Sequence, residues 1–561
     1  MSRHSHRVVA FLTAALCLWA VAAAPAASAH ATVVATDPAD GALLAAAPAR
    51  VTITYSEAVE LQLGALRVFA PDGSQVEAGS AEHLAGKPET ASVPLKAGLK
   101  NGTYVVSWRV ISADSHPVRG AWTFSVGAVS APNSGGADAA PSGNHAVGLL
   151  FGIARWLAYL GFAALAGGAF LLIAFAPKLA GDIRLRRLIG GGWFALLLGT
   201  VIALLSQGPY AGGFGLGRAL DVDVLRATLH TRLGRALAWR LILLGAAGVL
   251  VSWIATRLTE ADTRTRRTVG GLGAALAVAL AVTWSLAGHS GTGSQVGFAL
   301  PSDVLHLLAM ATWVGGLSAL TLAILGRRQT VLDPDDRLAL VRRFSATAFA
   351  AVCVLAATGV YQGWRQVRHW DTLFETNYGR LLVIKSCCFL VLLGLGYLAR
   401  RILAAESPDL AVLRRSVAAE LGIAIAVLAV TALLVESQPA ASAAPAPKPA
   451  SASSPFDTGS ANGTGTVNIT LDPARVGPDQ LHIYVLDKNG GQESVPEVTA
   501  ALALPAQQLG PLPVKLDLAG PGHYTNPSTV LPVAGQWQVI VTVRTTDIDQ
   551  ATVILNVNVS K

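Results

Sequence analysis

Eight long apolar stretches occupy the middle of this 561-residue chain and limit what it can fold into. They lie near residues 146–176, 188–208, 236–256, 268–288, 300–325, 344–364, 380–399 and 416–436. Each can cross a hydrocarbon core of about 30 Å, which takes roughly 20 helical residues. Only 14% of the residues are charged, against roughly 25% in a soluble protein. We therefore predict an all-α transmembrane bundle of eight helices over residues 146–436.

The loops between these spans differ in charge. The first, third, fifth and seventh loops are rich in Lys and Arg, whereas the fourth, which contains His289, has neither. Because cytoplasmic loops carry an excess of Lys and Arg, we expect the odd loops in the cytoplasm and both ends of the chain outside it. The formal charge of +8 thus lies between apolar segments. It does not form the basic patch that a nucleic-acid partner requires.

The first 29 residues have the pattern of a secretory signal peptide. Arg3 and Arg7 precede an uncharged apolar stretch, and Ala27 and Ala29 provide the small residues of a cleavage site. Cleavage after Ala29 makes His30 the first residue of the mature protein.

Two segments of alternating apolar residues flank the predicted bundle. Residues 30–127 and 461–561 alternate with the period of strands, and each predicts a β-sandwich. Residues 128–145 and 437–460 are rich in Ala, Ser, Pro and Gly and are predicted to be linkers. The fold class is therefore a multi-domain membrane protein: β-sandwich, eight-helix bundle, β-sandwich. We expect the first linker to hold its sandwich near the membrane without tight docking.

The first sandwich contains a candidate metal site. Asp114 and His116 are two residues apart after a predicted strand, so both side chains can reach one ion. An N-terminal His30 would add an amine and an imidazole. Such nitrogen and oxygen ligands suit tetragonal Cu(II), and protonation below neutral pH should weaken binding.

The sequence at these positions resembles a known family. Residues 30–60, HATVVATDPADGALLAAAPARVTITYSEAVE, and 102–126, GTYVVSWRVISADSHPVRGAWTFSV, are similar to the CopC copper-binding domain. The resemblance implies that His30, Asp114 and His116 bind Cu(II), with Glu57 close by in support. The chain has no methionine except Met1 and Met310, so the Met-rich Cu(I) loop of some CopC proteins is absent. We expect a domain for Cu(II) alone.

The fifth span contains residues that are costly inside a membrane. Asp303, His306 and Met310 follow one another along one helical stripe, and His289 lies in the short loop before them. We predict an entrance formed by His289 and His306, with Met310 one turn deeper as a soft ligand for Cu(I).

The bundle and the C-terminal segment also resemble known families. DVLHLLAMATWVGGL in the fifth span, with similar runs in the first and seventh spans, resembles the CopD membrane domain, which implies passage of copper. Cys387 and Cys388 are further possible Cu(I) ligands. GHYTNPSTVLPVAGQWQVIVTVR, which contains His523, resembles the YtkA-like sandwiches. The whole chain resembles the YcnJ-like CopC/CopD copper-resistance and copper-transport fusion proteins.

We predict a copper-binding transport protein of the cell membrane that is not an enzyme. It would capture Cu(II) outside and pass copper to the bundle, in the direction of import. Its expected partners are the copper ion, the lipid bilayer and an extracytoplasmic copper chaperone or reductase. The chain has no P-loop motif for ATP. Three alternatives stay open: a copper-sequestering resistance protein without transport, a histidine-brace copper oxidase, and a haem-bearing redox membrane protein.

The predicted ligand set depends on a free amine at His30. A mature protein that keeps one additional residue before His30 should bind Cu(II) more weakly, because the amine and the imidazole then no longer chelate together. N-terminal sequencing and Cu(II) titration of one sample measure this. Unchanged binding with the additional residue present would show that His30 is not a ligand.

Overall fold

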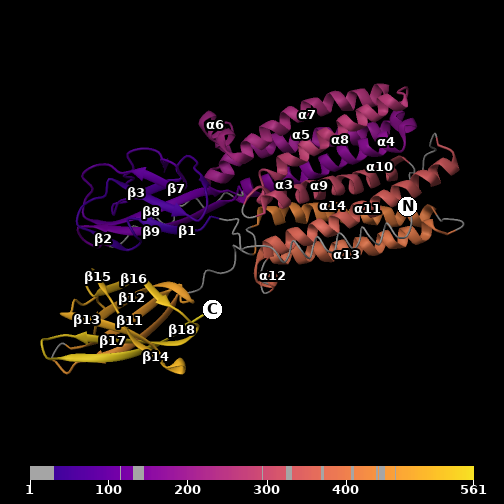
Figure 1. Ribbon diagram of the computed structural model, residues 1–561. Coiled ribbons are helices and arrows are strands. Elements are labelled where there is room, and N and C mark those ends of the chain that lie inside the picture. Colours follow the sequence, from indigo (N-terminus) through magenta and orange to yellow (C-terminus); the bar gives the residue numbers. More distant parts are fainter. Residues whose placement is uncertain are drawn as a thin grey trace.

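The computed structural model describes residues 31–113, 115–130, 145–292, 295–323, 332–367, 370, 372–405, 410–437, 440, 449–460 and 463–560. They form an N-terminal β-sandwich, a bundle of long apolar helices and a C-terminal β-sandwich (Figure 1). This confirms the predicted fold class. The predicted signal peptide and residues 131–144 of the first linker lie outside the described residues.

The N-terminal sandwich has two sheets. One has the order β1-β3-β7-β6, and the other has the order β2-β9-β8-β4 with β5 also paired to β8. Apolar residues at alternate positions fill the space between the sheets, and Ile53, Val106 and Phe124 are fully buried. The strands are β1 (Val33–Asp37), β2 (Ala42–Leu44), β3 (Arg50–Tyr55), β4 (Val59–Glu60), β5 (Leu66–Phe69), β6 (Glu82–Leu84), β7 (Lys87–Pro94), β8 (Gly102–Ser112) and β9 (Pro117–Val126).

Strand β8 departs from the alternating pattern. All 11 of its residues are buried, although only alternate side chains of a strand point to the sandwich core. Arg109, near its end, donates hydrogen bonds to backbone oxygens of the bundle. The end of β8 is therefore buried because it meets the membrane domain.

Within the described residues, eight helical segments are long and apolar enough to cross a membrane. They run Ala146–Ala174, Ile183–Gly212, Arg232–Arg257, Thr263–Ser285, Val296–Leu322, Asp335–Val367, Asn377–Leu403 and Val412–Glu436. Each overlaps one of the predicted spans, so the chain is a multi-pass membrane protein.

The bundle helices are labelled in Figure 1. They are α3 (His145–Phe162), α4 (Gly168–Ala174), α5 (Ile183–Gly212), α7 (Arg232–Arg257), α8 (Thr263–Ser285), α9 (Val296–Met310), α10 (Gly316–Ala323), α11 (Pro334–Val367), α13 (Asn377–Leu403) and α14 (Leu410–Glu436). The shorter α6 (Val222–His230) and α12 (Thr372–Glu375) lie at the end of the bundle that faces the sandwiches.

The first and fifth spans touch through their backbones at two glycines. Each span contains one π-helical turn, Ala163–Gly167 and Ala311–Gly315. A Cβ on Gly167 would overlap the Ala311 carbonyl oxygen, and a Cβ on Gly315 would overlap the Ala163 carbonyl oxygen. Small residues permit such close contact between membrane helices. This contact fixes the fifth span, which carries Met310, against the first.

The C-terminal sandwich also has two sheets, β10-β11-β12-β16-β15 and β14-β13-β17-β18. Its core is separate from the other two cores and contains the fully buried Trp537. The strands are β10 (Ala450–Asp457), β11 (Thr464–Asp472), β12 (Gly477–Asp487), β13 (Glu497–Leu504), β14 (Leu509–Val514), β15 (Asp517–Gly520), β16 (His523–Leu531), β17 (Gly535–Arg544) and β18 (Gln550–Val559).

Strand β10 lies inside the segment 437–460 that the sequence analysis assigned to a linker. Its residues pair with β11 in continuous antiparallel register, from Ala450 with Leu471 to Asp457 with Thr464. Sheet pairing uses backbone groups, so the Ala- and Ser-rich composition does not prevent this strand.

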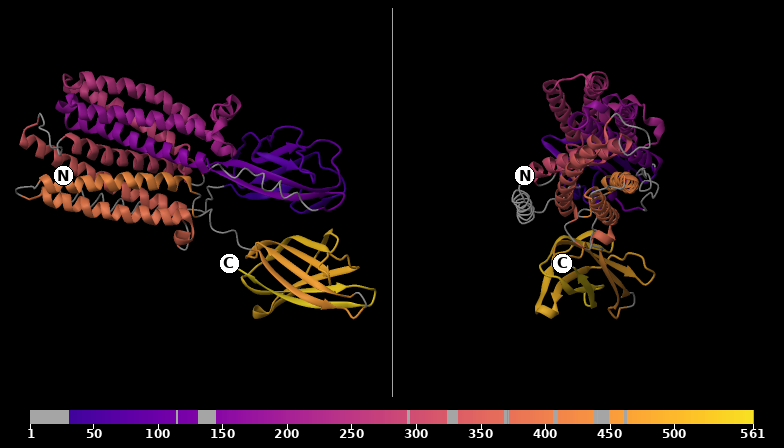
Figure 2. Two further views of the ribbon diagram at one scale, coloured as in Figure 1. Left: turned by 180° about the vertical axis from the view of Figure 1, so that it is seen from behind. Right: turned by 90° about the vertical axis from the view of Figure 1, so that its right-hand side faces the viewer.

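The two sandwiches lie at the same end of the bundle, one beside the other (Figures 1 and 2). This agrees with an even number of spans between them. Strand β2 of the first sandwich contacts β15 of the second.

The glycine contact leads to a stability prediction. Gly315→Ala should lower the free energy of unfolding by about 1–3 kcal/mol, because the added methyl group forces two backbones apart. Gly245→Ala is the matched control, since nothing lies within 4 Å of a Cβ at that position. Thermal unfolding in detergent measures both, and equal melting temperatures would contradict the close backbone contact.

Candidate metal centre

The hairpin loop between β8 and β9 carries the candidate ligands of the first sandwich. The Ser112 amide donates to the His116 carbonyl oxygen at 2.9 Å, and the Ser115 amide donates to the Ser112 carbonyl oxygen at 2.9 Å. Ser115 has a positive φ of 72°, a conformation in which residues other than glycine are uncommon. The loop is thus a tight turn that ends at His116. His30 and Asp114 lie outside the described residues.

Gly120 in the following strand explains part of the local sequence pattern. It pairs with Trp108 across the hairpin, and the Trp108 ring occupies the place where a Cβ of residue 120 would lie. Trp108 also meets Tyr55 edge to face, with ring centroids 5.5 Å apart. Glycine at 120 therefore lets the aromatic core extend beneath the loop that carries His116.

Glu57 and the start of the mature chain converge on this loop. The Glu57 carboxylate accepts hydrogen bonds from the Ser112 hydroxyl at 2.5 Å and the Ala113 amide at 3.3 Å. The Ala31 amide donates to the Ser112 hydroxyl oxygen at 3.1 Å. Ala31, the residue after His30, and Ser112 and Ala113, the two residues before Asp114, are therefore joined in one hydrogen-bonded group. Glu57 therefore orients the loop through its hydrogen bonds with Ser112 and Ala113.

His116 lies against a histidine of the membrane domain. The ring centroids of His116 and His289 are 4.8 Å apart, and both rings are buried. His116 Nε2 lies 2.8 Å from the carbonyl oxygen of Val435. A carbonyl oxygen only accepts, so Nε2 carries the proton, and in the neutral ring Nδ1 is the nitrogen that can bind a metal. From the sequence, these two histidines are predicted to lie in separate sites.

Hydrogen bonds hold the sandwich on the bundle around this histidine pair. Arg109 donates to the carbonyl oxygens of Ala211 at 2.5 Å and Tyr210 at 2.8 Å. The Ser115 hydroxyl donates to the Ala287 carbonyl oxygen at 2.7 Å. We expected the linker to hold the sandwich near the membrane without tight docking. In the structure the sandwich is docked, because its charged and polar side chains donate to backbone oxygens at the helix ends.

Arg232, at the start of α7, joins three segments at the same interface. Its side chain donates to the carbonyl oxygens of Ala113 at 3.0 Å, Leu286 at 3.1 Å and Gly291 at 3.0 Å. Its backbone amide donates to the Glu60 carboxylate at 2.7 Å. Burial raises the pKa of Glu60, and Arg232 acts in the opposite direction. One arginine thus connects the loop of His116 to the loop of His289.

A cavity of about 1070 Å³ lies next to this histidine pair. His116 and His289 line it, and so do three residues of the fifth span: His306, Met310 and Trp313. The structure therefore brings His116 of the first predicted site and the predicted residues of the membrane domain to one continuous cavity. Four further ionisable side chains line the cavity and were not predicted from the sequence: Arg155, Arg240, Lys385 and Glu436. Cys387, a predicted possible Cu(I) ligand, lines it as well.

Polar partners fix the ionisable residues of the fifth span. The Ser285 hydroxyl donates to the Asp303 carboxylate at 2.7 Å, and the Gln362 amide donates to it at 3.4 Å. His306 Nδ1 lies 2.8 Å from the Thr358 hydroxyl, which donates its own proton to the Val354 carbonyl oxygen. Thr358 therefore accepts from Nδ1, which leaves Nε2 as the basic nitrogen of His306.

The described residues do not contain a complete metal site. No three His, Cys, Asp or Glu side chains among them are close enough to hold one ion. A full ligand set at His116 requires His30 and Asp114, which stay predictions. Lys385 could have been selected from the sequence, because it is an ionisable residue inside a predicted span, as Asp303 is.

The interface leads to a prediction about domain docking. Arg232→Ala should loosen the sandwich, because it removes three hydrogen bonds from a charged donor, each of which contributes about 1.5–3 kcal/mol. Electron–electron distance measurements between nitroxide labels at positions 87 and 264, in a cysteine-free background, should give a broader distribution. Arg50→Ala is the control, since its partner Glu82 lies on the exposed surface of the same sandwich. Identical distributions for both variants would contradict docking through Arg232.

Family comparisons cover the first sandwich and most of the bundle. The CopC domain matches residues 33–127. The N-terminal domain of copper resistance protein D-like proteins matches residues 146–297, and copper resistance protein D matches residues 338–434. The matched ranges end before the C-terminal sandwich, so its YtkA-like resemblance stays a prediction.

Individual relatives agree with these matches. The chain is 29% identical to the copper transport protein CutJ of Bacillus subtilis (strain 168) over 470 residues, which are 82% of this chain and 83% of CutJ. Protein YobA of Escherichia coli (strain K12) is 35% identical over 102 residues, 18% of this chain and 82% of YobA. Copper resistance protein C of Pseudomonas syringae pv. tomato is 32% identical over 105 residues, 18% of this chain and 82% of that protein.

The CopC-like domain implies copper binding. Since CopC and both copper resistance protein D regions occur together in one chain, this protein belongs to the copper resistance and copper transport family that joins a CopC domain to a CopD membrane domain.

Proposed function

We propose that the protein captures Cu(II) outside the cytoplasm and passes copper inward through the bundle. The observation that carries this proposal is the contact between His116 of the sandwich and His289 of the bundle, whose ring centroids are 4.8 Å apart and which both line the cavity. Copper on His116 would need to move only a short distance to reach a ligand of the membrane domain. The relative CutJ is a copper transport protein, which supports the same proposal.

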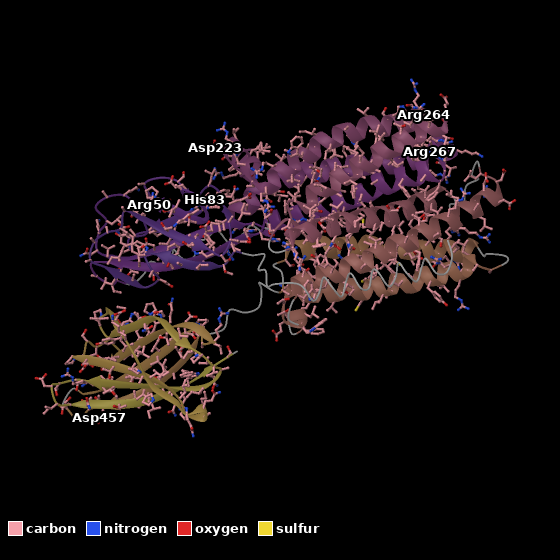
Figure 3. All side chains as sticks on the ribbon, viewed as in Figure 1. Arg50, His83, Asp223, Arg264, Arg267 and Asp457 are labelled. Carbon is pink, nitrogen blue, oxygen red and sulfur yellow. The ribbon has the colours of Figure 1, made fainter. Side chains whose placement is uncertain are left out.

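The charge distribution of the bundle supports the proposed orientation. Arg264 and Arg267 lie at the end of the bundle opposite the two sandwiches (Figure 3). Because Lys and Arg favour the cytoplasmic side, that end would face the cytoplasm, and both sandwiches would lie outside. An inside-negative membrane potential then favours inward movement by about 2.3 kcal/mol per unit charge per 100 mV. Import therefore does not require ATP.

The cavity favours transfer between ligands over attraction by charge. Its described lining residues include the acidic Asp303 and Glu436 and the basic Arg155, Arg240 and Lys385. These charges do not form the acidic ring of a cation channel. Copper would instead exchange between neutral donors, from His289 to His306 and then to the Met310 thioether.

The thioether determines which oxidation state would pass. Soft sulfur ligands select Cu(I), whereas His and carboxylate ligands accept Cu(II). Passage by Met310 therefore requires one electron for each ion, which an extracytoplasmic reductase would supply. In this proposal the protein moves copper and catalyses no reaction of its own, so it is not an enzyme.

The proposal separates the residues for capture from those for passage. His116→Ala should remove the Cu(II) EPR signal of the first sandwich and lower the uptake of isotopic copper by about tenfold or more, because the ligand set is incomplete. Met310→Leu should keep the EPR signal and lower uptake alone. His83→Ala is the control, since His83 is exposed and binds the Thr90 carbonyl oxygen within the sandwich.

Two results would overturn parts of the proposal. Unchanged uptake and EPR spectrum after replacement of both Asp114 and His116 would remove the capture site. Cell-associated copper that an external chelator removes completely would indicate sequestration without transport. Turnover with peroxide would favour a copper oxidase, and a Soret band would favour a haem protein.

A further inference from the structure

The C-terminal sandwich carries a pair of histidines that the transport proposal does not use. His482 lies on β12, and His523 is the first residue of the neighbouring strand β16. Tyr484, two residues after His482 on β12, is the residue that pairs with His523 in the register of these strands. His482 Nδ1 and His523 Nε2 are 3.1 Å apart. The sheet therefore brings two imidazole nitrogens from distant parts of the sequence into direct contact.

The histidine pair lies on the outer face of its sheet. Ile483 and Tyr524, the neighbours of the two histidines in sequence, are buried in the core, and successive side chains of a strand point to opposite faces. Tyr484 shares the outer face and stacks on His523 with ring centroids 4.3 Å apart and planes 14° apart. This stacking restricts the rotation of the His523 ring and holds its nitrogen toward His482.

The face with the histidine pair is turned toward the N-terminal sandwich. Strand β15, beside β16 in the sheet, contacts β2 of the N-terminal sandwich. Asp40 lies two residues before β2. The Asp40 carboxylate accepts a hydrogen bond from the Thr123 amide at 3.0 Å, which fixes its position. Its negative charge acts on both His482 and Tyr484. The pair therefore lies between two folded domains, with carboxylates on both sides, because Asp472 of the C-terminal sandwich also acts on His482.

Partial burial acts on both rings of the pair. Burial lowers the pKa of His523 to about 4, and the neighbouring His482 adds to this effect. Burial also lowers the pKa of His482, against the opposing influence of Asp472 and Asp40. The two ring nitrogens are hydrogen-bond partners, so one ring donates to the other.

We propose that His482 Nδ1 and His523 Nε2 bind a second Cu(II) ion. Two nitrogens about 2.0 Å from one metal lie about 2.8 Å apart at a right angle and about 3.3 Å apart at a tetrahedral angle. The observed 3.1 Å lies between these values, so the strands already hold the nitrogens at the spacing of adjacent ligands. Binding replaces the hydrogen bond between the rings. Both ring nitrogens then turn toward the ion, and one ring proton moves to the other nitrogen of the same imidazole, so that no proton is released.

The donor atoms favour Cu(II) over Cu(I). The C-terminal sandwich contains no Cys or Met, so it offers no soft sulfur ligand. Water would complete the coordination, and Asp40 and Asp472 would reduce the cost of the positive charge. This site is separate from His116, because β2 lies at the end of the first sandwich away from the bundle (Figure 1).

Cu(II) titration of the full-length protein in detergent, followed by EPR, tests the second site. His482→Gln with His523→Gln should remove one bound Cu(II) and its nitrogen hyperfine signal from the wild-type protein. The same loss should occur in a His116→Ala background. His83→Gln with His230→Gln is the matched control, because it removes two exposed histidines from other surfaces. An unchanged number of bound ions in the His482 and His523 variant would overturn the proposal.

A measurement on the wild-type protein covers the case in which the double variant does not fold. Diethylpyrocarbonate modifies accessible imidazoles, and mass spectrometry reports each modified histidine. Added Cu(II) should protect His482 and His523 and leave the modification of His230 unchanged. Equal modification with and without Cu(II) would overturn the second site. Neither result depends on transport, so failure of the second site is distinguishable from failure of the transport proposal.

Discussion

The arrangement of the protein depends on backbone oxygens at the ends of membrane helices that accept hydrogen bonds from a soluble domain. The last carbonyl groups of a helix have no partner within the helix, and at the end of the bundle that faces the sandwiches Arg109, Arg232 and Ser115 supply donors to such groups and to nearby loops. These contacts bury His116 against His289. Without them the sandwich would be an independent domain, and its loop would have no fixed relation to the cavity.

A second constraint acts inside the bundle. Gly167 and Gly315 permit the first and fifth spans to touch backbone to backbone, each within a π-helical turn. The additional residue in a π turn shifts the side chains that follow it around the helix axis. Trp313 lies within the turn of the fifth span and Met310 lies directly before it, and both line the cavity. Tight packing on one side of the fifth span therefore determines which residues face the space on the other side.

Much of the fold followed from local patterns in the sequence. The eight apolar stretches predicted the bundle, since a membrane span depends on length and composition alone. Alternating apolar residues predicted both sandwiches, because successive side chains of a strand point to opposite faces of a sheet. The strand Ala450–Asp457 was missed because its stability comes from pairing with β11, which its own Ala, Ser and Pro residues do not indicate. The family resemblance predicted that Glu57 lies near the loop of His116. The hydrogen bond from Ser112 to Glu57 gives the physical reason for this proximity.

The sequence by itself determined the number of spans, the residue types suited to copper and the family, because these depend on composition, spacing and motif. Only the tertiary structure decided which of those residues meet. His116 and His289 are 173 residues apart in sequence, and His482 and His523 are 41 apart, yet each pair is in contact. Contacts over such separations depend on domain docking and strand register, which arise from packing of the whole chain and leave no periodic signal in either segment.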